Sequence, residues 1–246
     1  GATLAGCRSV EVPVDEQWRL DLAAVDPADA RRALALWVNS PGNPAGQLDD
    51  LDAAAQWGRA HGVPVFSDEC YLEFTWDGPP CTILSSGPMG VVAVHSLSKR
   101  SNAAGLRAGF YAGDAGLVRY LSEVRKHAGF LVPGPVQAAA GVALEDDAHV
   151  EAQRELYRQR LGYFRSLLAA LGVEAGLPGG GFYLWAPAPG GDAWAFTERL
   201  AVEAGCLVSP GDLYGPPGAG HVRIALVRPL DRLRLVAQRL GITELE

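Results

Sequence analysis

Short apolar runs alternate with longer segments of helical spacing along most of the chain. Residues 48–60 carry apolar positions at helical spacing, and Gly62 is placed to end that helix. Four runs around and after this segment are typical of strands buried on both faces: 33–39, 63–69, 91–96 and 108–113. The alternation predicts an α/β fold with a doubly wound, mostly parallel sheet.

The pattern turns helical from residue 115, and residues 149–171 form a long amphipathic segment. The remaining expected elements are strands at 180–186, 206–210 and 221–227 and helices at 192–204 and 231–240. This tail predicts a smaller α/β domain. We therefore expect residues 1–148 to form the remainder of a large domain, and residues 149–246 to form a connecting long helix and a small C-terminal domain.

The first residues of the chain have an unusual pattern for the start of a domain. Residues 1–15 begin at Gly1 without a methionine and look like the end of a helix that runs into a strand. We expect either a natural fragment or an N-terminal portion that is missing from the sequence.

Composition narrows the class of protein. Of the 246 residues, 48% are hydrophobic and 20% charged, and the net charge is −7, so the chain does not attract nucleic acid or anionic membranes electrostatically. We find no apolar stretch long enough to span a bilayer and no signal peptide, so the cytoplasm is expected. The 4 cysteines and 5 histidines are scattered, so we expect neither a disulfide framework nor a metal site.

Candidate chemistry concentrates in loops that follow predicted strands, and the segment 95–110 is the most informative. Lys99 is flanked by Ser96 and Ser98, whose hydroxyls can bind phosphate oxygens, and Arg107 can make a bidentate charged contact. In open α/β sheets, ligands bind outside the carboxyl ends of the strands. Taken alone, Lys99 could equally be a solvated surface lysine.

Two other loops carry polar side chains at strand ends. Asp68 ends a buried strand and would need a cationic partner, which a protonated ring nitrogen could supply, and Tyr71 could hydrogen-bond an oxyanion of the same ring. Asn43 can present its amide within a rigid turn set by Pro44 and Gly46. An acidic turn and a plain Gly/Pro loop are the ordinary alternatives.

Together the motifs resemble a known family. The segments N-P-A-G with Asn43, D-E-C-Y with Asp68 and Tyr71, and S-L-S-K followed by G-L-R-A-G look like the fold-type-I, class I/II aminotransferases. These enzymes depend on pyridoxal 5′-phosphate (PLP). The resemblance continues through 208–215 and 221–226 and so covers essentially the whole chain.

The resemblance implies a role for each matching residue. Lys99 would carry PLP as a Schiff base, and after release its amine would be the general base. Asp68 would keep the pyridine nitrogen protonated, which makes the ring an electron sink. The other expected contacts are Asn43 and Tyr71 to the ring's phenolic oxygen, Ser96, Ser98 and Arg107 to the phosphate, and Arg223 to the substrate α-carboxylate, with Asn43 also expected to bind the substrate.

The chain also departs from the family pattern. Relatives carry further N-terminal residues that supply the glycine-rich half of the phosphate cup, the aromatic that stacks on the ring and much of the substrate pocket. Family sites are completed by the partner subunit of a homodimer. We therefore expect a homodimer at full length and an impaired catalyst without those residues.

Within the family, the same segments are similar to actinobacterial N-succinyl-L,L-diaminopimelate aminotransferases. This implies transfer of an amino group from glutamate to N-succinyl-2-amino-6-oxopimelate, in lysine and diaminopimelate biosynthesis. Two other classes stay open: another fold-type-I PLP enzyme, such as a β-lyase or a cyclopropane-forming synthase, and the effector domain of a PLP-binding transcription regulator.

Overall fold

The computed structural model describes residues 1–242, which divide into two compact units. The first unit contains Gly1–Ser40, Gln47–Cys70 and Cys81–Ala138, and the second contains Pro41–Gly46, Tyr71–Pro80 and the chain from Ala139 onward. The boundary expected between residues 148 and 149 stays a prediction about the domains, and residues 243–246 of the expected second domain lie outside the described residues.

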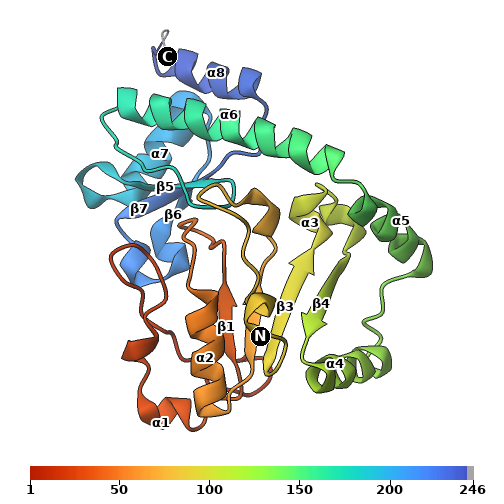
Figure 1. Ribbon diagram of the computed structural model, residues 1–246. Coiled ribbons are helices and arrows are strands. Elements are labelled where there is room, and N and C mark those ends of the chain that lie inside the picture. The colour runs from red at the N-terminus through yellow and green to blue at the C-terminus, as the bar shows by residue number, and fades with distance from the viewer. Residues whose placement is uncertain (243–246) are drawn as a thin grey trace. The chain divides into compact units, whose positions relative to one another are not determined.

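A four-stranded sheet forms the centre of the first unit (Figure 1). Its strands are β1 (Leu36–Asn39), β2 (Val65–Asp68), β3 (Val91–Ser96) and β4 (Gly109–Gly113), in the order β1-β2-β3-β4. The first three are parallel, with Leu36 opposite Val65 and Val65 opposite Val91. Side chains of the strands, of the helix at Leu51–His61 and of the flanking segments build one core: Leu36, Val38, Leu51, Ala54, Ala55, Val63, Val65, Ile83, Val91 and Ala93.

Strand β4 runs antiparallel to β3, so the sheet is mostly but not entirely parallel. Only residues 97–108 join the two strands, and they hold the short helix α3 (Leu97–Arg100) and one 3₁₀ turn. A parallel return would usually need a full helix that crosses one face of the sheet, whereas α3 has only four residues. The short connection therefore explains the reversed direction.

Capping residues set the limits of the first unit's helices: α1 (Pro27–Ala30), α2 (Leu51–His61), α3 and α4 (Ala115–His127). The Asp50 carboxylate accepts from the Ala53 N–H and begins α2, whereas Gly62, at φ 66°, ends it. The expected end of a helix running into a strand in residues 1–15 was wrong, because Ala2–Gly6 form turns and Val14 makes only an isolated bridge to Leu20.

The second unit has a three-stranded antiparallel sheet in the order β5-β7-β6. Its elements are β5 (Tyr183–Pro187), β6 (Ser209–Pro210), β7 (His221–Ala225), α6 (Ala148–Ala170), α7 (Ala193–Ala204) and α8 (Leu230–Arg239). Helices α6 and α8 run side by side (Figure 1). The core between helices and sheet includes Phe164, Leu168, Leu184, Leu200 and Leu226.

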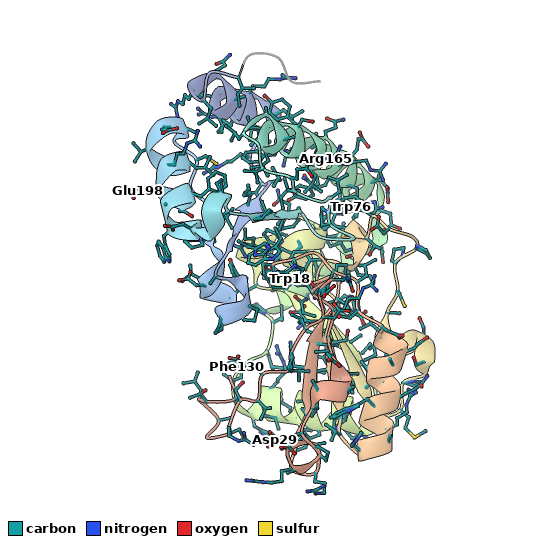
Figure 2. All side chains as sticks on the ribbon, turned by 90° about the vertical axis from the view of Figure 1, so that its left-hand side faces the viewer. Trp18, Asp29, Trp76, Phe130, Arg165 and Glu198 are labelled. Atoms are coloured by element: carbon teal, nitrogen blue, oxygen red, sulfur yellow. The ribbon has the colours of Figure 1, made fainter. Side chains whose placement is uncertain are left out.

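Aromatic packing extends this core toward the start of α6. Trp76, labelled in Figure 2, lies beneath the guanidinium groups of Arg154 and Arg158, at 5.1 and 5.8 Å from its ring centroid. Cation–π contacts of this kind add to the stability that apolar burial supplies.

Further short elements complete the described chain. Helix α5 (Gly134–Glu145) crosses the division between the units. The 3₁₀ turns are Leu22–Ala24, Leu72–Phe74, Ile83–Ser86, Ala104–Leu106, Pro189–Gly191, Gly211–Tyr214 and Pro216–Gly218. Among residues 1–242, no helix combines the length and the apolar character that crossing a membrane requires.

Candidate functional site

Parallel pairing brings the carboxyl ends of β1, β2 and β3 to the same edge of the first unit's sheet. Asn39 lies opposite Asp68, and Asp68 lies opposite Val94, two residues before Ser96. Lys99 follows directly in α3. The predicted residues Asp68, Ser96, Ser98 and Lys99 therefore come from neighbouring strand ends, and all four are half-buried.

The short helix α3 explains how Lys99 is presented. The Ser96 hydroxyl oxygen accepts a hydrogen bond of 3.1 Å from the Ser98 N–H and caps the helix. This contact leaves the Ser96 O–H as a donor. A capped turn at the end of a buried strand holds Lys99 in a defined direction, unlike a lysine in an open loop.

The pKa of the Cys70 thiol depends on its burial and on the charges of Asp68 and Lys99. The Asp68 Oδ1 atom accepts from the Cys70 N–H at 3.1 Å. Burial raises the pKa of the Cys70 thiol far above its ordinary value; the Asp68 carboxylate raises it further, and the Lys99 ammonium lowers it. The Cys70 thiol therefore stays protonated at neutral pH beside the Asp68 carboxylate.

Glu69, the residue after Asp68, is a buried acid that contacts the neighbouring segments of this sheet edge. Glu69 is fully buried, its Oε1 accepts from the Ile83 N–H at 2.8 Å, and its Oε2 lies 3.5 Å from His95 Nε2. His95 stacks on Phe110 of β4, with ring centroids 4.8 Å apart. These contacts join the ends of β2, β3 and β4, and sequence reasoning assigned no role to Glu69 or His95.

Arg107 differs from the other expected phosphate ligands in its surroundings. It has a left-handed backbone, with φ 51°, and its side chain is exposed. Its Nη1 donates to the Ala104 carbonyl at 3.0 Å. Phosphate binding by Arg107 remains a prediction.

A second cluster lies within the second unit, around Arg223. This residue occupies the middle of β7, opposite Trp185 of β5 and Ser209 of β6. Its Nη1 donates to the Asn43 Oδ1 at 3.0 Å, which joins two of the predicted residues. Its guanidinium carbon lies 4.6 Å from the Tyr183 ring centroid and 5.0 Å from that of Tyr214.

Tyr71 belongs to the same cluster. Its side chain is buried, and its hydroxyl lies 2.8 Å from the Tyr183 hydroxyl. Tyr183 therefore contacts both Tyr71 and Arg223. The sequence analysis assigned no role to Tyr183 or Tyr214, although both lie in segments that it considered. An aromatic side chain in a strand or turn is usually part of the hydrophobic core, so nothing in the sequence marks these two as functional.

Each cluster, taken by itself, offers groups of the kind that PLP or an amino-acid substrate requires. The first unit offers an amine, a carboxylate and hydroxyls at one sheet edge, which suit an aldehyde, a pyridinium nitrogen and a phosphate. The second offers an amide, a phenol and a guanidinium held between two rings, which suit an oxyanion and a carboxylate. Within residues 1–242, no group of three or more His, Cys, Asp or Glu side chains is placed to hold a metal ion.

Comparison with solved structures identifies the class of protein. Apo-BacF from Bacillus subtilis superimposes with a TM-score of 0.89 at 29% identity, covering 97% of this chain and 64% of that chain. A double mutant of Thermus thermophilus aspartate aminotransferase gives 0.85 at 28% identity, covering 97% and 65%. The fold is that of PLP-dependent aminotransferases, with an incomplete large domain.

The family follows from the sequence. The model of the aminotransferase class I and II family matches residues 1–240, and the chain belongs to this PLP-dependent family. It is 42% identical to the 4-dedimethylamino-4-oxo-anhydrotetracycline transaminase OxyQ of Streptomyces rimosus, covering 97% of this chain and 66% of that protein. It is 37% identical to an LL-diaminopimelate aminotransferase of Desulforudis audaxviator, covering 89% and 58%. The chain thus spans less than two thirds of the length of these relatives.

Proposed function

We propose that this protein is a PLP-dependent aminotransferase that moves an amino group between an amino acid and a 2-oxo acid. The proposal rests mainly on the placement of two residues at neighbouring strand ends: Asp68 lies at the carboxyl end of β2, and Lys99 lies just past the carboxyl end of β3. Membership of the family and relatives named as transaminases support the same activity.

The proposed chemistry assigns cofactor binding and proton transfer to the first unit. PLP, when bound, supplies an electron sink for the bond that breaks at the substrate Cα. The Asp68 carboxylate would hold a proton on the ring nitrogen by charge pairing. The Lys99 amine would attach the cofactor and then, once free, accept the proton from the substrate Cα as general base. Ser96, Ser98 and Arg107 would hold the phosphate.

The second unit would orient the substrate. Arg223 would bind the α-carboxylate, and the Asn43 amide would hold the guanidinium while also facing the cofactor's phenolic oxygen. Tyr71 would donate to the same phenolic oxygen. A carboxylate held at a fixed angle keeps the Cα–H bond aligned for transfer to the general base.

The substrates form a finer part of the proposal. We propose glutamate as the amino donor and N-succinyl-2-amino-6-oxopimelate as the acceptor, in lysine and diaminopimelate biosynthesis. Relatives named LL-diaminopimelate aminotransferase support a substrate with this carbon skeleton. Another relative is named for an oxo-anhydrotetracycline substrate, so a polycyclic ketone is the acceptor to test beside it.

A homodimer in the cytoplasm is also part of the proposal. Phe130 and Leu131, in the segment after α4, are 66% and 63% exposed, and Tyr120 within α4 is 67% exposed. Large apolar side chains with this exposure favour burial against another chain.

Covalent attachment of PLP is the direct test of the proposed function. Borohydride reduction of the loaded protein, followed by peptide mapping, should place the pyridoxyl group on Lys99. Lys126, the only other lysine, is the internal control, because it is exposed and pairs with Glu123 at 3.7 Å in α4. Label on Lys126 would overturn the assignment.

Product analysis separates the proposed activity from the other PLP chemistries. With glutamate as donor, 2-oxoglutarate should form beyond one equivalent per bound PLP only when an amino acceptor is present. Release of a side-chain fragment without an acceptor would instead indicate a lyase, and label on Lys99 without turnover would favour a binding role.

A further inference from the structure

Tyr183 is placed where two of the proposed functional residues meet. It opens β5, is only 6% exposed, and pairs across the sheet with Ala225, two residues from Arg223. Its hydroxyl lies 2.8 Å from the Tyr71 hydroxyl, and its ring lies against the Arg223 guanidinium. One side chain therefore contacts Tyr71 through its polar end and Arg223 through its face.

The contact with Arg223 restricts the guanidinium. Two rings lie within reach of it, Tyr183 at 4.6 Å and Tyr214 at 5.0 Å, and Asn43 accepts from its Nη1. The Nε atom is buried and has no hydrogen-bond partner among the described residues. A guanidinium held by ring faces and one amide loses little further rotamer freedom when a carboxylate arrives, which lowers the entropic cost of binding.

The contact with Tyr71 acts on a hydroxyl. When the Tyr183 O–H donates to the Tyr71 oxygen, the Tyr71 O–H becomes a stronger donor to its own acceptor, because hydrogen bonds in a chain polarise one another. The edge-to-face packing of the two rings, with centroids 5.7 Å apart, keeps the hydroxyls together.

Ionisable side chains from other elements lie near Tyr183 or beside Arg223 among the described residues. Arg223 comes from β7, Tyr214 from the Gly211–Tyr214 turn, and Tyr157 from α6. The pKa of Tyr157 is raised, chiefly by burial, with Tyr183 raising it further and Arg160 lowering it. The aromatic cluster is thus poorly hydrated, which strengthens polar contacts inside it.

We infer that Tyr183 is a positioning residue that aligns the Arg223 guanidinium through its ring and strengthens the Tyr71 hydroxyl as a donor through its own hydroxyl. The inference rests on the proposed function, because it assigns Arg223 to the substrate carboxylate and Tyr71 to the cofactor. The two contacts predict separable effects: the ring acts on substrate binding, and the hydroxyl acts on the cofactor's proton affinity.

Two substitutions separate the ring from the hydroxyl in the PLP-loaded protein. Tyr183→Phe keeps the ring, so KM for the amino donor should stay within about twofold. The pH at which the bound cofactor's absorbance changes should rise by roughly half a unit, because Tyr71 becomes a weaker donor. Tyr183→Leu removes the ring as well, and KM should rise roughly tenfold with a smaller change in kcat.

Tyr157→Phe is the matched control, because it removes a nearby tyrosine hydroxyl and keeps the ring. The Tyr157 ring stacks on Phe182, with the two centroids 4.6 Å apart. It should change neither the absorbance titration nor KM. Thermal unfolding of the cofactor-free variants checks that each still folds, and Tyr183→Phe changes the packed volume least.

The outcomes distinguish this inference from the proposed function. If both PLP-loaded Tyr183 variants keep the wild-type absorbance titration and the wild-type KM, the inference is overturned and the proposed function stands. A wild type that takes up no PLP overturns the proposed function and this inference with it.

Discussion

Asp68 shows how a single residue combines a structural and a proposed chemical task. Its Oδ1 accepts from the Cys70 N–H, and its charge raises the pKa of the Cys70 thiol, so the thiol stays protonated beside it at neutral pH. The same carboxylate is proposed to hold the cofactor's ring proton. A substitution must therefore separate the local hydrogen bond from the charge.

Replacement of Asp68 by Ala or Asn should make that separation. Asp68→Asn keeps an acceptor for the Cys70 N–H but loses the charge, whereas Asp68→Ala loses both. We expect both variants to bind PLP and to lose roughly a hundredfold or more in turnover, since one transition-state charge contact contributes about 3 kcal/mol. Steady-state kinetics beside thermal unfolding provide the measurement, and an Asn variant with wild-type turnover would limit Asp68 to the structural task.

At the scale of elements, capping joins helix α4 to the neighbouring strand end. Asp114 follows β4 directly; its Oδ1 accepts from the Gly116 and Leu117 N–H groups at 2.9 and 3.1 Å, and its Oδ2 accepts from the Gly90 N–H at 3.0 Å. These bonds hold the pKa of Asp114 below its ordinary value, the Gly90 bond most. One carboxylate thus begins α4 and ties it to the turn before β3.

The Asp114 cap predicts a pH dependence of stability. Because the folded pKa lies below the unfolded one, its stabilisation is fully present above the unfolded value and is lost as pH falls through the folded value. Asp114→Asn lacks the charge, so the difference in unfolding free energy between wild type and variant should be largest near neutral pH and should shrink as pH falls below the ordinary pKa of an aspartate. Denaturant titrations across this range measure it, and a pH-independent difference would contradict the assignment.

At the scale of the whole molecule, cofactor binding and folding should be linked. A ligand that binds only the folded state stabilises it by about 2.7 kcal/mol at a hundredfold excess over Kd. PLP should therefore raise the thermal unfolding midpoint of the wild type and, equally, that of Lys126→Ala. Lys99→Ala should respond less, because the amine that attaches PLP is absent. Equal responses of the two lysine variants would place the attachment elsewhere.

Most of the elements and the family could be predicted from the sequence. Strand β3 occupies the residues expected for it, 91–96, and α6 begins and ends within one residue of the expected 149–171. Apolar periodicity and caps such as Asp50 and Gly62 are local signals, and local signals determine where a helix or strand begins and ends. The motifs around Asn43, Asp68 and Lys99 predicted the family because their order along the chain is itself sequence information.

Only the tertiary structure decided which distant residues meet. Asn43 and Arg223 are 180 positions apart, and Tyr71 and Tyr183 are 112 apart, so no local pattern connects either pair. The reversed direction of β4 and the burial of Glu69 behind the strand ends likewise depend on strand pairing. Periodicity specifies the face on which a side chain lies, whereas packing and pairing between remote segments decide its partner.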